Sequence, residues 1–368
     1  MTAVSRRLES HGPVLGSGVT GYAYANARIR GMRSRLLTRA QLDALVGMTD
    51  LTQIIQGLEG TEYGADVDAA VLQGRTPTNV DAGLKASMVR VHRKVLGFLA
   101  EESYDILTAL LGRWDIFNLK TVLRGKHMHL DAAEIEEGMV AAGQLAESDL
   151  EELAKLPDVK AVVDTLVTWG VPYARVLSRT YPEYRVSEDL SSMELALDRY
   201  YFEWAGQQLK GPGANKKAGR QVMGVQADVT NLLTVFRAIK ADLSGVDVST
   251  FFLRGGLYIH EREFVELLAL SDIDEVLDRV TRTPYGRALD EASLAYLEEG
   301  AISTLERALE EVLIRRAVAL GSVDPFGVGI AISYLWAKQN EVTNLRIIVR
   351  GVAAGLPEDR MRKELILV

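Results

Sequence analysis

The stretch of sequence that decides the fold reads WDIFNLKTVLR at residues 114–124. An acid, an asparagine followed by leucine, and a closing arginine stand at the same positions in DVTNLLTVFR at residues 228–237 and in EVTNLRIIVR at residues 341–350. The matching positions lie 113 residues apart, from 115 to 228 and again from 228 to 341. A register that holds over two such intervals indicates that one structural unit is used three times along the chain.

Each copy has the periodicity of a helix with one buried side. In the first copy Leu119, Val122 and Leu123 stand at i, i+3 and i+4, which predicts a helix packed on a core. The acid and the asparagine are three residues apart and share one side, whereas the arginine, nine residues after the acid, points elsewhere. We therefore expect the arginine to meet an acid or a helix C-terminus on a neighbouring helix. The repeated polar residues are Asp115, Asn118, Arg124, Asp228, Asn231, Arg237, Glu341, Asn344 and Arg350.

Two interpretations of these polar residues stay open from the sequence. Either they tie helices together within each unit, or they line a central opening and touch a partner. An asparagine that recurs within an otherwise apolar helix indicates a specific hydrogen bond, because an unpaired buried amide costs about 1–3 kcal/mol.

The segments between the copies also have helical periodicity. Each begins with two short helices, and an aspartate, at Asp50, Asp158 and Asp272, is placed to cap the second of them. A polar bridge is expected next, near residues 73–79, 184–189 and 287–290. A long helical segment then follows at about residues 81–102, 190–210 and 291–319. No alternating strand pattern competes with these assignments, so the predicted fold class is all-α.

The repeats predict a leader followed by three helical units. The expected bounds are 1–20 for the leader and 21–130, 131–243 and 244–368 for the units. Three wedge-like units can close about a pseudo-threefold axis or stack as an open solenoid, and the repeat pattern alone does not choose between them.

Composition narrows the class of protein. The chain has 368 residues, 48% of them apolar, and a net charge of −8, which argues against a nucleic-acid partner. It has no cysteine, so it has neither disulfides nor thiolate metal sites. The longest apolar stretch, residues 325–337, falls short of the roughly 20 residues needed to cross a bilayer. We therefore expect any membrane association to run through a partner.

Positive charge is nevertheless concentrated in two places. Arg28, Arg30, Arg33 and Arg35 lie close together, and the Gly/Pro-rich loop at residues 210–217 ends in Lys216 and Lys217. Such a run is either a solvated helix face or a docking surface for an acidic partner. These six residues are the candidate docking residues.

No catalytic, cofactor or metal site is predicted. The GSGVTG sequence at residues 16–21 has the spacing of a dinucleotide-binding loop, but no apolar strand precedes it. His127 and His129 would point apart on a helix, so they are poorly placed to chelate a metal. Without a nucleophile motif or a paired acid and base, the chain is not expected to be an enzyme in its own right.

The remaining signature is a family resemblance. The last third reads YLWAK at residues 334–338, EVTNLR at residues 341–346 and GLPE at residues 355–358. ELALDRYYF at residues 194–202 and the opening YAYANARIR at residues 22–30 fit the same pattern. Over about residues 21–368 the chain resembles the C subunits of the A/V-type ATP synthases, which are homologous to the d subunits of vacuolar ATPases.

That resemblance implies an all-helical, funnel-like body with pseudo-threefold symmetry and no cofactor. It implies one copy per complex on the cytoplasmic face of the membrane, seated on the proteolipid rotor ring and holding the central shaft of D- and F-type subunits. Its implied role is to couple the rotation of ring and shaft, without catalysis of its own, during ion transport linked to ATP synthesis or hydrolysis. Two alternatives remain: a soluble helical-repeat adaptor that binds protein partners, and a helical hydrolase with an unrecognised site.

Overall fold

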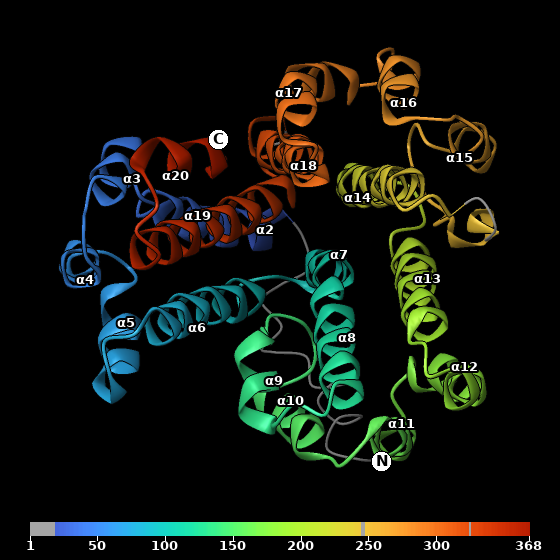
Figure 1. The fold of residues 1–368 in the computed structure, drawn as a ribbon. Coiled ribbons are helices and arrows are strands. Elements are labelled where there is room, and N and C mark those ends of the chain that lie inside the picture. The colour runs from blue at the N-terminus through green and yellow to red at the C-terminus, as the bar shows by residue number, and fades with distance from the viewer. Residues whose placement is uncertain (1–18, 244–246, 324) are drawn as a thin grey trace.

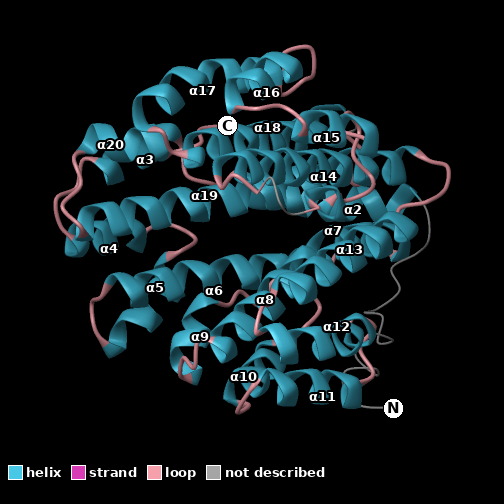
Figure 2. Ribbon diagram, turned by 45° about the vertical axis from the view of Figure 1, so that its right-hand side comes forward, coloured by secondary structure: helices cyan, strands magenta, loops and turns pink. Residues whose placement is uncertain are grey.

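The computed structural model describes residues 19–243, 247–323 and 325–368 of the chain (Figure 1). All regular structure in these ranges is helical, which confirms the all-α prediction (Figure 2). Of the predicted leader, residues 1–18 lie outside the described residues, and residues 19 and 20 belong to the first described helix.

The helices follow the chain in this order. The first group comprises α2 (Val19–Arg33), α3 (Arg39–Val46), α4 (Leu51–Glu59), α5 (Gly64–Ala70), η1 (Val71–Gln73), α6 (Pro77–Leu96), α7 (Glu101–Leu111) and α8 (Arg113–His127). The second comprises α9 (Ala132–Gly138), α10 (Glu147–Lys155), α11 (Val159–Trp169), α12 (Ala174–Ser187), α13 (Ser191–Gln208) and α14 (Ala214–Lys240). The third comprises η2 (Val248–Phe251), α15 (Glu261–Leu268), α16 (Ile273–Val280), α17 (Gly286–Glu299), α18 (Ile302–Val323), α19 (Gly329–Ala353) and α20 (Glu358–Glu364).

The three copies of the repeated motif lie on α8, α14 and α19, as their periodicity predicts. The aspartates placed at the start of the second short helices are also N-caps. Asp50, Asp158 and Asp272 accept hydrogen bonds from backbone N–H groups three residues later, at 3.0, 2.8 and 2.9 Å. Each of these caps fixes where α4, α11 or α16 begins.

Two of the predicted long helical segments, at residues 291–319 and 81–102, are each divided between two helices. Residues 287–290, expected to form a bridge, lie inside α17, and the chain instead breaks at Gly300, whose φ of 64° is left-handed. Arg287 to Asp290 contain no helix breaker, whereas glycine adopts a left-handed conformation without steric cost. The segment at 81–102 is likewise divided, because α6 ends at Leu96 and α7 begins at Glu101.

The long helices form the interior of the molecule and the short ones surround it. In Figure 1, α3 to α5, α9 to α12 and α15 to α17 lie at separate edges of the view. Each motif helix packs on the helices that follow it in the chain: α8 on α9, α10, α11 and α13, and α14 on α15, α16 and α18. The last one, α19, packs on α2, α3, α4 and α6 near the other end of the sequence.

Two apolar cores result from this packing. The larger one contains side chains from α2, from α6 to α19 and from the C-terminal segment, among them Leu119 and Leu232. The smaller one joins the early helices α3 to α6 to the late helices α19 and α20, through residues such as Leu58 and Leu345. Replacing one of these fully buried leucines with alanine is expected to destabilise the protein by about 2–5 kcal/mol.

Candidate functional site

The asparagine of each motif binds the backbone of one residue 22 positions later. Asn118 donates from Nδ2 to the Val140 carbonyl at 2.7 Å, and its Oδ1 accepts from the Val140 N–H at 2.8 Å. Asn231 makes the same pair of bonds to Leu253 at 2.8 and 2.9 Å. These asparagines are fully buried, and each side-chain amide satisfies the N–H and the carbonyl of a residue that lies outside the helices.

The acid of each motif accepts backbone N–H groups from a segment just before a short helix, which is α10 for Asp115 and α15 for Asp228. Asp115 accepts from Gln144 and Leu145, each at 3.0 Å. Asp228 accepts from Leu257, Tyr258 and Ile259 at 3.0, 3.0 and 2.9 Å. It also accepts from the hydroxyl of Tyr285 at 2.7 Å.

A glycine makes this close approach possible in two of the copies. A Cβ at Gly143 would lie 2.2 Å from Oδ1 of Asp115, and one at Gly256 would lie 2.1 Å from Oδ1 of Asp228. Both distances are far inside van der Waals contact, so no side chain fits there. Because Gly143 and Gly256 are also 113 residues apart, the glycine belongs to the repeat, although it is not among the repeated residues predicted from the sequence.

Burial acts against ionisation of both aspartates. Desolvation raises the pKa of Asp115 to about 6, with the two backbone hydrogen bonds acting in the opposite direction. Desolvation likewise raises the pKa of Asp228, opposed by its hydrogen bonds from Ile259 and Tyr285. Neither carboxylate forms an ion pair within the described residues.

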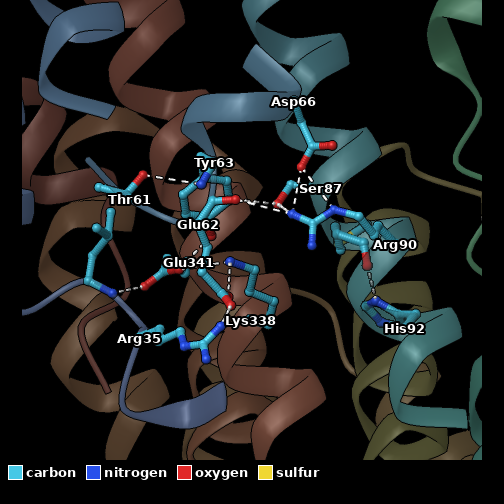
Figure 3. A network of polar contacts seen from close by, with 12 residues as sticks. Arg35, Thr61, Glu62, Tyr63, Asp66, Ser87, Arg90, His92, Lys338 and Glu341 are labelled. Atoms are coloured by element: carbon cyan, nitrogen blue, oxygen red, sulfur yellow. Dashed lines mark hydrogen bonds and ion pairs between the residues drawn. The ribbon is translucent and has the colours of Figure 1, made fainter. Parts of the chain in front are cut away.

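The third acid, Glu341, takes its partners from the early part of the chain. It accepts from the N–H of Leu37 and from the hydroxyl of Tyr63. The ammonium of Lys338 lies 3.4 Å from Glu341 Oε1 and 3.7 Å from Glu62 Oε2 (Figure 3). It also lies 3.6 Å from the centre of the Tyr63 ring, in cation–π contact.

The charges of this cluster are buried. The Lys338 side chain is completely buried, and desolvation lowers its pKa while Glu341 and Glu62 act to raise it. Desolvation, together with the negative charge of Glu341, holds the pKa of Tyr63 well above its usual value. Lys338 therefore neutralises a carboxylate that is otherwise held by one N–H and one hydroxyl group.

The arginines that close the motifs each meet an acid on another helix. Arg124 on α8 donates to both carboxylate oxygens of Glu194 on α13, at 2.6 and 2.5 Å. Arg237 on α14 donates twice to Oε1 of Glu306 on α18, at 3.0 and 2.6 Å. The sequence allows an acid or a helix C-terminus as the partner, and in these two copies the partner is an acid.

The third arginine joins the late helix α19 to the early helix α6. Arg350 donates to Oδ2 of Asp81 at 3.2 Å, Arg346 donates to Oδ1, and Lys85 lies 3.2 Å from Oδ2. Asp81 is only 3% exposed. Although burial acts to raise its pKa, the hydrogen bond from Arg346 and the charges of Lys85 and Arg346 outweigh burial and lower it.

Sequence reasoning missed the acidic half of these pairs. Asp81 and Glu194 are 113 residues apart and Glu306 follows Glu194 by 112, so a signal was present. It was hidden because one acid is an aspartate and the residues around the three acids differ.

The four candidate docking arginines near the start of the chain all have partners inside the molecule. The Arg28 guanidinium lies 4.5 Å over the Phe98 ring, and Arg30 donates to the Pro325 carbonyl at 2.7 Å. Arg33 donates to Ser333 Oγ at 2.7 Å, and Arg35 lies 3.4 Å from Glu62. Arg28, Arg30 and Arg35 are exposed and Arg33 is half-buried, so these residues both connect α2 to other helices and present charge at the surface.

The loop candidates begin the long helix α14. Lys216 donates to the Lys210 carbonyl at 3.0 Å, which folds the preceding turn onto the helix. Lys217 is exposed, and its ammonium forms no hydrogen bond or ion pair with any residue that the structure describes. The structure thus separates the two sets, with Arg28 to Arg35 on and just after α2 and the lysines on the first turn of α14.

Two further features bear on the class of site. Within residues 19–243, 247–323 and 325–368, no three histidine, aspartate or glutamate side chains gather in a way that could hold a metal ion. No helix in the described part of the chain combines the length and apolar character needed to span a membrane.

Comparison with known proteins agrees with the sequence signature. The chain matches the model of the family described as ATP synthase (C/AC39) subunit over residues 25–364. It is 28% identical to the C subunit of the A-type ATP synthase of Methanocaldococcus jannaschii, an alignment that covers 94% of this chain and 86% of that protein. It is 30% identical to the protein of the same name from Methanococcoides burtonii, with 95% of each chain covered, and 31% identical to that of Methanothermobacter thermautotrophicus, with 94% and 87% covered. The chain therefore belongs to the ATP synthase (C/AC39) subunit family.

Proposed function

We propose that this protein couples the central shaft of a rotary A/V-type ATP synthase to its membrane rotor ring, without catalysing a reaction itself. In this proposal one copy per complex sits on the cytoplasmic face of the membrane. One end binds the proteolipid ring and the other holds the foot of the D- and F-type shaft subunits.

The observation that carries the proposal is the connection between the late and early helices. Glu341 on α19 binds the backbone at Leu37 and the hydroxyl of Tyr63, and Asp81 on α6 is bound by Arg346 and Arg350. The same arginine-to-acid connection runs from α8 to α13 and from α14 to α18. A body whose late helices are fixed to its early ones resists twisting, because packed interiors deform little. Such stiffness is what a part that transmits torque requires.

We further propose that the three units are related by a pseudo-threefold axis and form a funnel, with boundaries near residues 130 and 243. The matched hydrogen bonds of Asn118, Asn231 and Asn344 support equivalent environments for the three motif helices. Because each motif helix packs on the following unit, the units interlock rather than stand side by side.

The docking proposal is that the shaft or the ring meets the positive surface at Arg28, Arg30, Arg33 and Arg35 or at Lys216 and Lys217. The exposed charge of Arg28, Arg30, Arg35 and Lys217 supports it on a chain of net charge −8. Arg33 is less suited to a direct contact because its guanidinium bonds to Ser333.

The test is a bridging experiment with purified components. The tagged full chain is mixed with detergent-solubilised proteolipid ring and with shaft subunits, and complexes are analysed by native mass spectrometry. The expected result is a complex of ring, shaft and one copy of this chain, with no ring–shaft complex when the chain is left out.

Binding to the ring alone or to the shaft alone would refute the coupling role. Purification of the tagged chain from native membranes provides the second arm, and the ring proteolipid and shaft subunits should accompany it in a constant ratio. If the chain instead comes only from the soluble fraction with other proteins, the adaptor interpretation replaces the coupling proposal.

A further inference from the structure

A cavity of about 310 Å³ lies beside the acid of the first motif, between α7, α8, α13 and the turn before α12. Aromatic side chains form much of its wall, namely Tyr104, Tyr173, Tyr200 and Trp204. The carboxylates of Asp105, Asp115 and Asp149 also line it, and none of its lining residues is a lysine, arginine or histidine. Tyr104, one of the lining residues, is 38% exposed, so the cavity communicates with solvent. Its size is at the lower end of the range for sites that bind small molecules.

Asp115 is the least satisfied of the three motif acids. Asp228 accepts three N–H groups and a tyrosine hydroxyl, and Glu341 has one N–H, one hydroxyl and the Lys338 ammonium. Asp115 accepts two N–H groups, and among the described residues it forms no hydrogen bond with a tyrosine hydroxyl and no ion pair. Each carboxylate oxygen can accept a second hydrogen bond, so Asp115 retains acceptor capacity at the cavity wall. Because burial raises its pKa only to about 6, the group is mostly an anion at neutral pH.

The third copy of the motif contains what the first copy lacks. Lys338 stands three residues before Glu341 and holds its ammonium between that carboxylate, at 3.4 Å, and the Tyr63 ring, at 3.6 Å (Figure 3). In the first copy the corresponding elements are Asp115 for the acid and Tyr173 for the tyrosine that follows the second short helix. The residue three before Asp115 is Gly112, which has no side chain to place there.

Gly112 leaves the cavity open. Its φ of −55° and ψ of −19° are ordinary helical values, so its backbone does not require glycine. A Cβ there would meet the ring of Trp204 at 2.9 Å, and Gly112, Trp204 and Tyr173 all line the cavity. Tyr173 makes no hydrogen bond to Asp115, and its ring contacts Tyr200 edge-on instead. Asp115 and Tyr173 thus line the same cavity without a hydrogen bond between them.

One more polar side chain lines the cavity and has an unused hydrogen-bonding atom. The Oγ1 of Thr108, which lines the same cavity, is buried and has no hydrogen-bond partner among the described residues. An ammonium has three N–H donors and attracts both a carboxylate and an aromatic face. A carboxylate, a hydroxyl oxygen and a tyrosine ring, all from residues that line one cavity, match that set of needs.

We propose that this cavity binds the ammonium group of a small primary amine. The ammonium lies between the Asp115 carboxylate and the Tyr173 ring, where Lys338 lies in the third copy, and the apolar part of the amine contacts Trp204 and Tyr200. This inference goes beyond the coupling role and does not depend on it.

The experiment is isothermal titration calorimetry of the full chain with n-butylammonium chloride. The buffer is phosphate at constant ionic strength, since common amine buffers would compete. We expect a saturable single site for n-butylammonium and none for n-butanol, which has the same shape without the charge. Equal binding of the two, or no binding of the amine, would overturn the proposal.

Variants test the placement of the ligand. Asp115→Asn is expected to weaken binding at least tenfold, and Thr108→Val about threefold or more. Thr108→Val is nearly isosteric, so it reports on the site even if Asp115→Asn disturbs folding. Thr234→Val, at a helical threonine outside the cavity, is the matched control and should leave the affinity unchanged. Unchanged affinity in both cavity variants would place the amine elsewhere and refute the assignment.

A third variant places a lysine in the first copy of the motif, at the position that Lys338 occupies in the third copy. Gly112→Lys supplies a tethered ammonium and should abolish binding of the free amine. Gly112→Ala introduces the same Cβ and the same shift of Trp204, but it should still bind the free amine. Equal loss in both would mean that the site fails for steric reasons, contrary to the proposal.

The ammonium could belong to a free metabolite or to a lysine side chain of another protein. A lysine blocked at both its amino and carboxyl ends is therefore titrated in parallel. Binding of n-butylammonium but not of blocked lysine identifies a free amine as the ligand class. Equal binding of both extends the same site to a protein lysine.

Discussion

The side-chain amide of Asn344 donates to the carbonyl of Ile366 at 2.8 Å and accepts from its N–H at 3.1 Å. The pair is 22 residues apart, as are Asn118 and Val140 in the first copy of the motif. A buried amide that satisfies both polar groups of one distant residue fixes the path of the intervening segment. This explains why an asparagine, rather than another polar residue, recurs in an apolar helix.

Replacing Asn231 with leucine should lower the free energy of unfolding by about 2–4 kcal/mol, because it leaves a buried N–H and a buried carbonyl of Leu253 without partners. Urea unfolding followed by circular dichroism measures the change. Gln56→Leu is the matched control, because Gln56 is exposed on α4 and its replacement should stay within about 0.5 kcal/mol of wild type. A loss at Asn231 no larger than that of the control would contradict a structural role for the amide.

The ion pairs between units should differ sharply in strength. Asp81→Asn leaves Lys85, Arg346 and Arg350 without their buried anion and should destabilise the protein by about 3–5 kcal/mol. Glu194→Gln removes a pair whose arginine side chain is 60% exposed, and should cost less than about 1 kcal/mol. Thermal and urea unfolding of both variants provide the comparison. Similar losses would show that burial of Asp81 does not decide its contribution.

The buried ring of His92 predicts a loss of stability in mild acid. Burial, as the main cause, lowers its pKa from 6.5 to about 4, although the hydrogen bond between Nδ1 and the Met88 carbonyl opposes the shift. Between pH 6.5 and 4 the unfolded state therefore binds more protons than the folded state. The contribution of the neutral ring to the free energy of unfolding, about 3 kcal/mol at neutral pH, is lost as the pH falls through that window.

Urea unfolding of wild type and His92→Leu from pH 4 to pH 7.5 tests this prediction. The free energy of unfolding of wild type minus that of the variant should fall toward low pH, because the variant has no ring to protonate. Asp115 has a raised pKa, so its contribution to stability changes in the opposite direction over nearly the same pH range. Both proteins contain Asp115, so this contribution cancels when the two are compared. His260→Leu, at an exposed position, is the control. A constant difference would mean that the ring does not titrate as described.

Charge reversal should distinguish the two candidate docking surfaces. Lys216→Glu with Lys217→Glu is expected to weaken binding of the shaft or the ring at least tenfold, and to reduce the salt dependence, if the start of α14 docks there. Lys155→Glu with Lys160→Glu changes the net charge equally on α10 and α11 and is the matched control. Equal binding in all of these variants would leave the exposed arginines of α2, tested through Arg30→Glu, as the remaining candidate.

The backbone at Gly143 packs directly against the Asp115 carboxylate, and this close packing predicts the effect of adding a side chain there. Gly143→Ala forces a methyl group against Asp115 and should destabilise the protein by about 1–3 kcal/mol, the usual result of overpacking. Gly206→Ala, in α13 with open space around it, should instead be neutral or slightly stabilising. Unfolding in urea separates the two outcomes, and an unaffected Gly143→Ala variant would show that the segment can move.

The sequence predicts those parts of the fold that depend on local pattern. The motif helices and the caps at Asp50, Asp158 and Asp272 are predictable because periodicity and capping chemistry are local. The backbone donors to Asp115 are not, because every residue but proline carries an N–H and no residue type marks them. The contact between Glu341 and Leu37 spans 304 residues and depends on how the helices pack, which periodicity does not encode.

The cavity beside Asp115 shows the same limit in another form. Gly112 is one of 32 glycines, and nothing in its neighbours indicates that its missing side chain leaves room. The correspondence with Lys338 rests on the hydrogen-bond partners of the three acids, which the residue pattern does not reveal.

The joint core of α19 with α3 to α6 also sets the order in which the protein can be made. Asp81 leaves the ribosome 265 residues before Arg346, and at about 5–20 residues per second the early helices wait at least about ten seconds for their partner. During that time the apolar faces of α4 and α6 are uncovered, so the nascent chain is exposed to aggregation until α19 is synthesised. Chaperone dependence should therefore be greatest for the part of the molecule that is translated first.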